Sequence, residues 1–285
     1  MNYRHAYHAG NFADVLKHAV LALCLDHLRA KPAPFRVIDT HAGAGRYDLA
    51  GSEAGKTLEW AEGIGRLLGV DAPPLPPPVE AALAPYLDVV RAINPDGRLT
   101  LYPGSPMIAR AMLRAGDRLV VNELHPADNR ALAALFRNDA EVAVMGLDGW
   151  TAVKALLPPQ ERRGLLLVDP PFEAPGEFEL LARAVAEARK RFAAGTMLFW
   201  YPIKDAKRVE EFRAAIAQEG REKSLRAELL ARRPDNPSTF NGCGLFIVNP
   251  PWTLREKLEI VLPFLAERLA QGPGADYRLD AQGAD

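Results

Sequence analysis

The spacing of apolar residues predicts that helices and strands alternate along most of the chain. Near the beginning, apolar side chains recur at helical spacing from Phe12 to Leu28, with Asn11 as a candidate N-cap and Pro32 just beyond the end. The short apolar run 35–39 then predicts a buried strand, and the glycine-containing segment 40–45 predicts the turn that follows it.

From residue 118 onward the alternation becomes regular. The predicted strands cover 118–124, 141–146, 164–168 and 196–201, and the predicted helices lie near 127–137, 150–157, 177–192 and 205–219. Repeated strand–helix units form a parallel sheet with helices on both faces. Two further strands, 224–231 and 244–248, are joined by a loop that is too short for a crossover helix. We therefore expect the last strand to run antiparallel.

The pattern is looser between residues 51 and 115, where a cluster of prolines separates two helical stretches. We expect this segment to form a small helical insertion subdomain in a domain made of residues 1–50 and 116–271. The small, polar residues 272–285 predict a disordered tail. The expected fold class is α/β, with a Rossmann-like seven-stranded sheet whose last strand is antiparallel.

Composition and charge describe an ordinary soluble chain. It has 285 residues, of which 48% are hydrophobic and 25% are charged, and no apolar stretch approaches the roughly 20 residues that span a bilayer. We expect a cytoplasmic protein with no membrane contact.

Cys24 and Cys243 have no partners at metal-ligand spacing, and His5, His8 and His18 have no acidic or thiol partner at such spacing, so neither a disulfide nor a metal site is expected.

Net charge does not indicate a nucleic-acid-binding protein, but the distribution of charge is uneven. The formal net charge is −1, whereas residues 183–233 contain 13 Lys or Arg against seven Asp or Glu. This excess is typical either of solvated helix surfaces or of a face that contacts phosphates, and the sequence leaves both interpretations open.

The tetrapeptide Asp169-Pro170-Pro171-Phe172 follows the apolar run 164–168. The Asp169 carboxylate and the Pro170 carbonyl can both accept hydrogen bonds from an amino group, the prolines hold the turn rigid, and the Phe172 ring can stack on a flat base. This combination predicts methyl transfer to an exocyclic amine. The alternative is an ordinary strand followed by a tight turn.

Polar residues also follow the other strands of the predicted sheet. In an open α/β sheet, ligands bind beyond the carboxyl ends of the strands. Segment 39–45, Glu123 and Asp148-Gly149 occupy such ends, as does Asp169. Gly43 allows close backbone approach, Glu123 can accept two ribose hydroxyls, and Asp148 can accept an adenine amino group. The pattern resembles class I S-adenosylmethionine-dependent methyltransferases. Two structural alternatives stay open: Glu123 could cap the following helix, and Asp148-Gly149 could simply form a turn.

A nicotinamide-binding domain is the competing interpretation, because Gly43-Ala44-Gly45 begins the dinucleotide fingerprint. The third glycine of that fingerprint would fall at Asp48, and the next acidic strand end, Glu123, comes about 80 residues later instead of roughly 20. The sequence therefore disfavours this alternative.

A second tetrapeptide, Asn249-Pro250-Pro251-Trp252, has the same form. It follows the strand that we expect to be antiparallel, so it should lie at the edge of the sheet opposite the cofactor. We predict a structural role for it, with Trp252 packed in the protein.

Seven separated motifs make the whole chain resemble the ribosomal RNA large subunit methyltransferase J family. They are Tyr3–Asn11, Ala13–His18, Asp39–Tyr47, Tyr102–Pro106, Glu123–Pro126, Asp148-Gly149 and Asn249–Trp252. The resemblance implies methylation of the exocyclic N6 amino group of one adenine in 23S rRNA, with S-adenosyl-L-methionine as the methyl donor. It also implies a monomer that meets the RNA free of protein or early in ribosome assembly.

The resemblance also implies roles for individual residues. Asp169 would be the catalytic carboxylate, assisted by Pro170 and Phe172, and the RNA would contact Tyr3, His5 and Lys17. The cofactor would contact His18, His41, Gly43, Ser105, Glu123, Asp148, Gly149 and Asp169. The family motif has Tyr where this chain has Phe172, so stacking is retained but a phenol hydrogen bond is lost.

Three other functions share some or all of these motifs. A DNA adenine-N6 methyltransferase would have all of them, and a non-catalytic RNA-binding module would bind RNA without consuming the cofactor. A protein glutamine methyltransferase would have Asn where this chain has Asp169.

Overall fold

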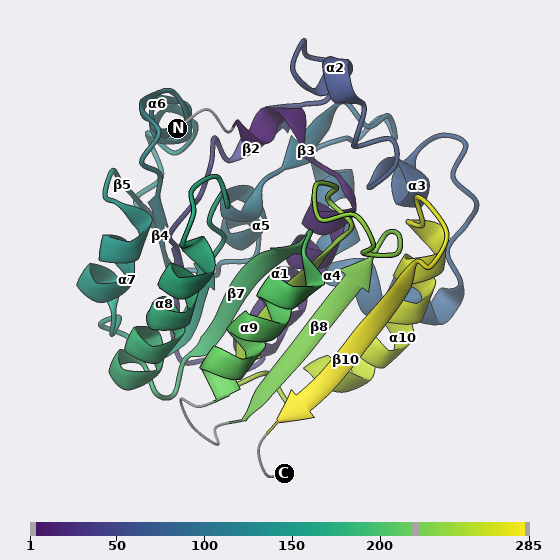
Figure 1. Ribbon diagram of the computed structural model, residues 1–285. Coiled ribbons are helices and arrows are strands. Elements are labelled where there is room, and N and C mark those ends of the chain that lie inside the picture. The colour runs from purple at the N-terminus through teal and green to yellow at the C-terminus, as the bar shows by residue number, and fades with distance from the viewer. Residues whose placement is uncertain (1–3, 218–222, 283–285) are drawn as a thin grey trace.

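The computed structural model describes residues 4–217 and 223–282 and contains one large mixed sheet (Figure 1). Its strands are β1 (Arg36–Asp39), β4 (Arg118–Asn122), β5 (Val142–Met145), β6 (Gly164–Val168), β7 (Thr196–Ile203), β8 (Ser224–Leu230), β9 (Gly242–Val248) and β10 (Asp276–Gln282). They lie in the order β10-β8-β9-β7-β6-β1-β4-β5, and a second sheet pairs β2 (Arg46–Asp48) with β3 (Leu101–Pro103).

The direction of the strands confirms the expected α/β arrangement. β1 pairs in parallel with β4 and β6, and β5 and β7 extend the parallel part on either side. β9 runs antiparallel to both β7 and β8, as the short loop before it predicted. The carboxyl ends of β1, β4, β5, β6 and β7 therefore meet at one edge of the sheet.

The sheet has eight strands, one more than the seven expected, because the predicted tail is wrong over residues 276–282. This segment forms β10, which pairs antiparallel with β8 at the edge of the sheet (Figure 1). Arg278 lies opposite Glu228 and Asp280 lies opposite Arg226, so opposite charges face each other across the two strands. Edge strands tolerate such charged sequences, which locally look like a polar tail.

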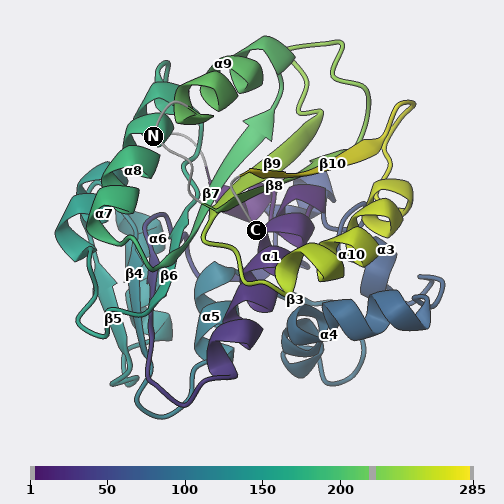
Figure 2. The same cartoon turned by 90° about the horizontal axis from the view of Figure 1, so that it is seen from below.

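Helices cover both faces of the sheet, as Figure 2 shows. On one face lie α1 (Phe12–Arg29), α4 (Pro77–Ala92), α5 (Ser105–Ala111) and α10 (Leu254–Arg268), and on the other lie α7 (Gly149–Leu156), α8 (Glu177–Arg191) and α9 (Ala206–Ala217). The remaining elements are α6 (Pro126–Leu135), which contacts β5, and the short η1 (His5–Tyr7), α2 (Ala54–Thr57) and α3 (Gly65–Leu68).

Helix α1 begins as predicted. The Asn11 side chain caps it, with Oδ1 accepting hydrogen bonds from the backbone N–H groups of Ala13 and Asp14 at 3.0 Å each. The helix is buried along almost its whole length, because it lies between the sheet and α4. Two charged side chains, Asp14 and Lys17, are buried with it. Buried charges require partners, and these side chains find theirs in the site described below.

Residues 51–115, expected as a helical insertion, contain α2 to α5 together with β3. Leu83, Tyr86 and Leu87 of α4 belong to the same apolar core as the buried face of α1. The division of the chain at residues 51 and 115 stays a prediction, since the two parts share this core. Within residues 4–217 and 223–282, no helix has both the length and the apolar character that crossing a bilayer requires.

Candidate active site

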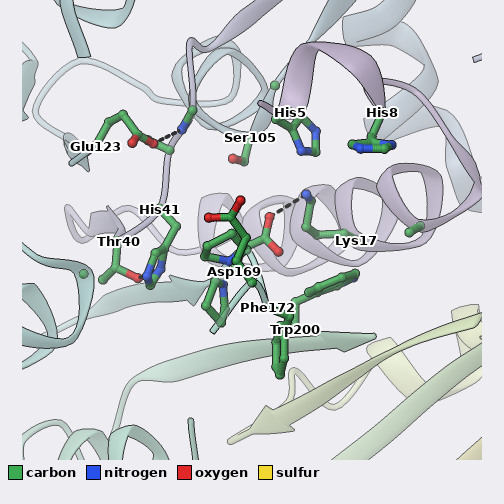
Figure 3. A pocket seen from close by; sticks show the side chains of 18 of the residues that line it. His5, His8, Lys17, Thr40, His41, Ser105, Glu123, Asp169, Phe172 and Trp200 are labelled. Carbon is green, nitrogen blue, oxygen red and sulfur yellow. Dashed lines mark hydrogen bonds and ion pairs between the residues drawn. The ribbon is translucent and has the colours of Figure 1, made fainter. Parts of the chain in front are cut away.

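A cavity of about 770 Å³ opens at the carboxyl ends of the parallel strands, within the usual volume of ligand pockets (Figure 3). Apart from Tyr3, which lies outside the described residues, every predicted site residue lines this cavity. These residues are His5, Lys17, His18, His41, Gly43, Ser105, Glu123, Asp148, Gly149, Asp169, Pro170 and Phe172. The fold thus brings together residues from η1, from α1, from the beginning of α5 and from the segments that follow β1, β4, β5 and β6.

Lys17 of α1 places its ammonium group between two carboxylates. Its Nζ lies 2.6 Å from Oδ2 of Asp169 and 2.8 Å from Oδ1 of Asp14 (Figure 3 shows the first contact). Burial alone would lower the pKa of Lys17, but the two carboxylates outweigh it and hold that pKa well above its ordinary value. The resemblance implied that Lys17 contacts the RNA. In the structure the Lys17 side chain is only 4% exposed, and its ammonium group holds the predicted catalytic carboxylate in place.

Asp14, which the sequence interpretation missed, connects Lys17 to the beginning of the chain. Its Oδ2 accepts hydrogen bonds from Nε2 of His5 and from the backbone N–H of Gly10, each at 2.9 Å. Burial alone would raise the pKa of Asp14, but His5, Lys17 and His18 hold it well below its usual range. The available signal was an acidic residue on an otherwise apolar helix, three positions before a lysine.

Asp39 and Ser105 form a buried pair at the end of β1. The Ser105 hydroxyl donates to Oδ2 of Asp39 at 2.6 Å, and the backbone N–H of His41 donates to Oδ1 at 3.2 Å. Burial raises the pKa of Asp39 to about 7, because two neutral donors do not replace the hydration that the carboxylate has lost. Ser105 therefore orders the turn after β1.

Glu123 holds the glycine turn that follows β1. Its Oε2 accepts from the backbone N–H of Gly43 at 2.8 Å and its Oε1 accepts from that of His125 at 2.6 Å. Gly43 has φ +60°, and a Cβ there would lie 2.3 Å from the Tyr47 hydroxyl oxygen, so only glycine fits. Burial raises the pKa of Glu123. The side-chain cap of α6 is His125, not Glu123, so the helix-cap alternative is wrong.

The His41 ring is oriented by Thr40. The Thr40 hydroxyl donates to the Leu167 carbonyl at 3.1 Å and lies 2.9 Å from Nδ1 of His41, which leaves Nδ1 as the donor and Nε2 as an acceptor. Burial lowers the pKa of His41 to about 4, so the ring is neutral near pH 7. A Cβ on Gly149 would lie 2.2 Å from Nε2, so that position requires glycine.

Two further predicted cofactor residues have structural partners. Asp148 is the N-cap of α7, with Oδ1 accepting from the backbone N–H of Thr151 at 2.9 Å, while its other oxygen makes no such contact with that helix. His18 is buried, with Nδ1 at 2.8 Å from the Tyr102 hydroxyl, and burial lowers its pKa to about 3. Both residues line the cavity while also ordering the elements around it.

Aromatic rings form one wall of the cavity. The Phe172 ring lies 4.8 Å from that of Phe178 and 6.0 Å from that of Trp200, which stands nearly perpendicular to it (Figure 3 shows Phe172 and Trp200). Trp200 lies on β7 and was missed, because within that strand it looks like any other core residue. Phe172 has φ +50°, an unusual conformation for a bulky residue and one that is often found at functional sites.

The second tetrapeptide lies at the opposite edge, as its strand direction predicted. It follows β9, and none of its four residues lines the cavity. Asn249 orders the loop by donating from Nδ2 to the carbonyls of Ala193 and Gly195, at 2.7 and 3.0 Å. The expected packing of Trp252 is wrong, since its side chain is 81% exposed. Asn249, and not Trp252, makes the contacts that fix the loop.

Several basic residues of the segment 183–233 form ion pairs along helices. Arg191 pairs with Glu187, Arg208 with Glu211 and Arg213 with Glu210, in each case three or four positions apart. This arrangement favours the solvated-surface interpretation for α8 and α9.

Of the residues that the structure describes, no three His, Cys, Asp or Glu side chains are grouped so that they could hold a metal ion.

In the mixed sheet, β9 lies between β7 and β8 and runs antiparallel to both, and the cavity opens at the carboxyl ends of the parallel strands. Together these features define a class I methyltransferase fold. The chain belongs to the family described as "Ribosomal RNA large subunit methyltransferase D, RlmJ", which matches residues 32–280. Two relatives named "Ribosomal RNA large subunit methyltransferase J" are each 41% identical to it. The one from Escherichia coli (strain K12) aligns over 94% of both chains, and the one from Haemophilus influenzae over 96% of both.

A solved structure shows the same fold. The crystal structure of protein LPL1258 from Legionella pneumophila superposes with a TM-score of 0.86 at 36% sequence identity, covering 96% of this chain and 98% of that one. The resemblance that the seven motifs indicated is therefore confirmed at the level of the family.

Proposed function

We propose that this protein transfers a methyl group from S-adenosyl-L-methionine to the N6 amino group of one adenine in 23S rRNA. Family membership supports an rRNA methyltransferase. The adenine amine is supported by one observation above all: Asp169, Pro170 and Phe172 line the same cavity, with the Asp169 carboxylate fixed by Lys17. Two acceptors and a ring at one point suit an amino group on a flat base.

The cavity fits the proposed cofactor. Gly43 and Gly149 line the cavity, and a Cβ at either position would collide with Tyr47 or His41, so the backbone there can hold its place at the cavity wall only as glycine. Glu123 would accept the ribose hydroxyls with lone pairs that its two backbone donors leave available, and Asp148 would accept the adenine amino group. S-adenosyl-L-methionine supplies an activated methyl group on a sulfonium.

The chain's own residues then bind and orient the substrate. The target adenine leaves its stack at a cost of a few kcal/mol, and stacking on Phe172 offsets part of that cost. Asp169 and the Pro170 carbonyl accept hydrogen bonds from the amine and direct its lone pair, and after transfer the surplus proton leaves to Asp169 or to water. Most of the acceleration comes from positioning and electrostatics, because the donor is already activated.

Labelled methyl transfer tests the proposal against its two alternatives. The protein is incubated with radiolabelled cofactor and either protein-free 23S rRNA or duplex DNA, and the nucleosides are then separated. We expect N6-methyladenosine from the RNA only. Label in DNA alone would indicate a DNA adenine methyltransferase, and RNA binding without label would indicate a non-catalytic module. We further expect a cytoplasmic monomer that meets the RNA before or early in assembly.

A further inference from the structure

Asp14 makes three hydrogen bonds in a buried position, and they join three separate parts of the site. Its side chain, 2% exposed, accepts from His5 of η1, from the backbone of Gly10 and from Lys17 one helical turn further along α1. The side chain that caps α1 is that of Asn11, and two of the three Asp14 contacts go to side chains that line the cavity. The carboxylate is therefore placed to hold side chains of the cavity rather than to begin the helix.

The contact with Lys17 is the one that reaches the reacting centre. The ammonium has three N–H donors. One donates to Asp14 at 2.8 Å and another donates to Asp169 at 2.6 Å. Because the ammonium is shared between two carboxylates, it cannot direct all of its N–H donors to Asp169. Without the charge of Asp14, Lys17 would pair with Asp169 alone, and Asp169 is the group that has to accept the substrate amine.

We propose that Asp14 is a positioning residue for methyl transfer, which holds Lys17 so that Asp169 keeps its orientation and an oxygen free for the substrate amine. This inference rests on the proposed function. Because Asp14 also binds His5, it links the first described turn of the chain to Lys17, and through Lys17 to the catalytic carboxylate.

Asp14→Asn is the first test, because it removes the charge and preserves the size. We expect kcat on 23S rRNA to fall at least about tenfold, while the dissociation constant for S-adenosylhomocysteine, measured by calorimetry, stays within about twofold. Turnover is expressed per S-adenosylhomocysteine-binding site, so a misfolded fraction does not count. Asp14→Glu keeps the charge and should retain more turnover than Asp14→Asn.

Asp117→Asn is the matched control. Asp117 is equally buried and accepts from the backbone N–H groups of Phe35 and Arg114, but it does not line the cavity. This change should lower the melting temperature and leave kcat per binding site unchanged. A purely structural role for Asp14 would give Asp14→Asn the same profile.

A double-mutant cycle decides whether Asp14 acts through Lys17. In a Lys17→Met background, Asp14→Asn should cause little further loss of kcat, because the ammonium that it positions is absent. Independent, additive losses would overturn the inference, as would wild-type kcat in Asp14→Asn, equal losses of kcat and of cofactor affinity, or failure of both Asp14 variants to fold. If wild-type protein does not methylate the RNA, the proposed function fails instead.

Discussion

Lys17 and Asp169 are 152 positions apart in the chain, yet their side chains meet at 2.6 Å. Lys17 lies on the helix that precedes the first strand, and Asp169 directly follows β6 in the middle of the sheet. The contact is possible because α1 packs across the sheet with its first turns near the carboxyl ends of the strands. The carboxylate proposed to receive the substrate amine is therefore fixed by a side chain from outside the strand–helix repeats.

Asp169→Ala should abolish methyl transfer and leave cofactor binding nearly intact. In the proposed mechanism the carboxylate acts on the amine, whereas Glu123 and the glycine turn hold the cofactor. Initial methylation rate and S-adenosylhomocysteine calorimetry are the two measurements. Retention of more than about a tenth of wild-type turnover would mean a barrier change under roughly 1.4 kcal/mol and would exclude Asp169 from the reaction.

Glu123→Ala should weaken binding of S-adenosylhomocysteine by about 1.5–3 kcal/mol, the range for hydrogen bonds to a charged group. The loss has two sources, the ribose contact and the order of the turn at Gly43. Glu141, a half-buried residue just before β5 that does not line the cavity, provides the control Glu141→Ala. Unchanged affinity in a folded Glu123→Ala variant would remove the ribose assignment.

Phe172→Ala and Trp252→Ala should have separable effects. Stacking of a base on an aromatic ring is worth about 1–3 kcal/mol, so Phe172→Ala should lower turnover or RNA affinity. Phe172→Tyr should be tolerated, since the ring is retained. Trp252→Ala should change the free energy of unfolding by less than about 0.5 kcal/mol and leave the rate unchanged, because its side chain is 81% exposed. If only the Trp252 variant lost activity, the catalytic loop would have to be assigned to the tetrapeptide at the opposite edge of the sheet.

Asp39→Asn should stabilise the protein more at pH 8 than at pH 4.5. Burial raises the pKa of Asp39 to about 7 in the folded state, so between about pH 4 and pH 7 the native protein retains a proton that the unfolded chain has lost. Stability from this group is present below pH 4 and is lost as the pH rises through 7. The asparagine variant does not titrate there, so thermal unfolding should show a melting-temperature difference that grows with pH. A constant difference would mean that Asp39 is ionised throughout.

The strands, their directions and the edge that holds the cavity could be predicted from local pattern. Apolar periodicity located β1 and β4 to β9 of the large sheet, and the rule that parallel strands share one carboxyl edge placed Glu123, Asp148 and Asp169 at a single site. The same rule placed Asn249 at the opposite edge without any contact information. These inferences needed only residues close together in sequence.

What the sequence did not show depends on distant partners. β10 is held by cross-strand pairs such as Arg226 with Asp280, which are 54 positions apart. Trp252 is exposed in a loop that is held by Asn249, whose partners are the carbonyls of Ala193 and Gly195 just before β7. The role of Asp14 depends on which side chains surround it in the folded protein. In each case the local sequence is compatible with more than one environment, and tertiary packing selects among them.

The most direct test of the proposed function is mass-spectrometric mapping of 23S rRNA from a strain that lacks this protein. One adenine should lose its N6-methyl group, and the wild-type gene should restore the methyl group while the Asp169→Ala gene should not. A methylation pattern identical to that of the parent strain, or restoration by the Asp169→Ala gene, would contradict the assignment of this protein as the adenine-N6 methyltransferase.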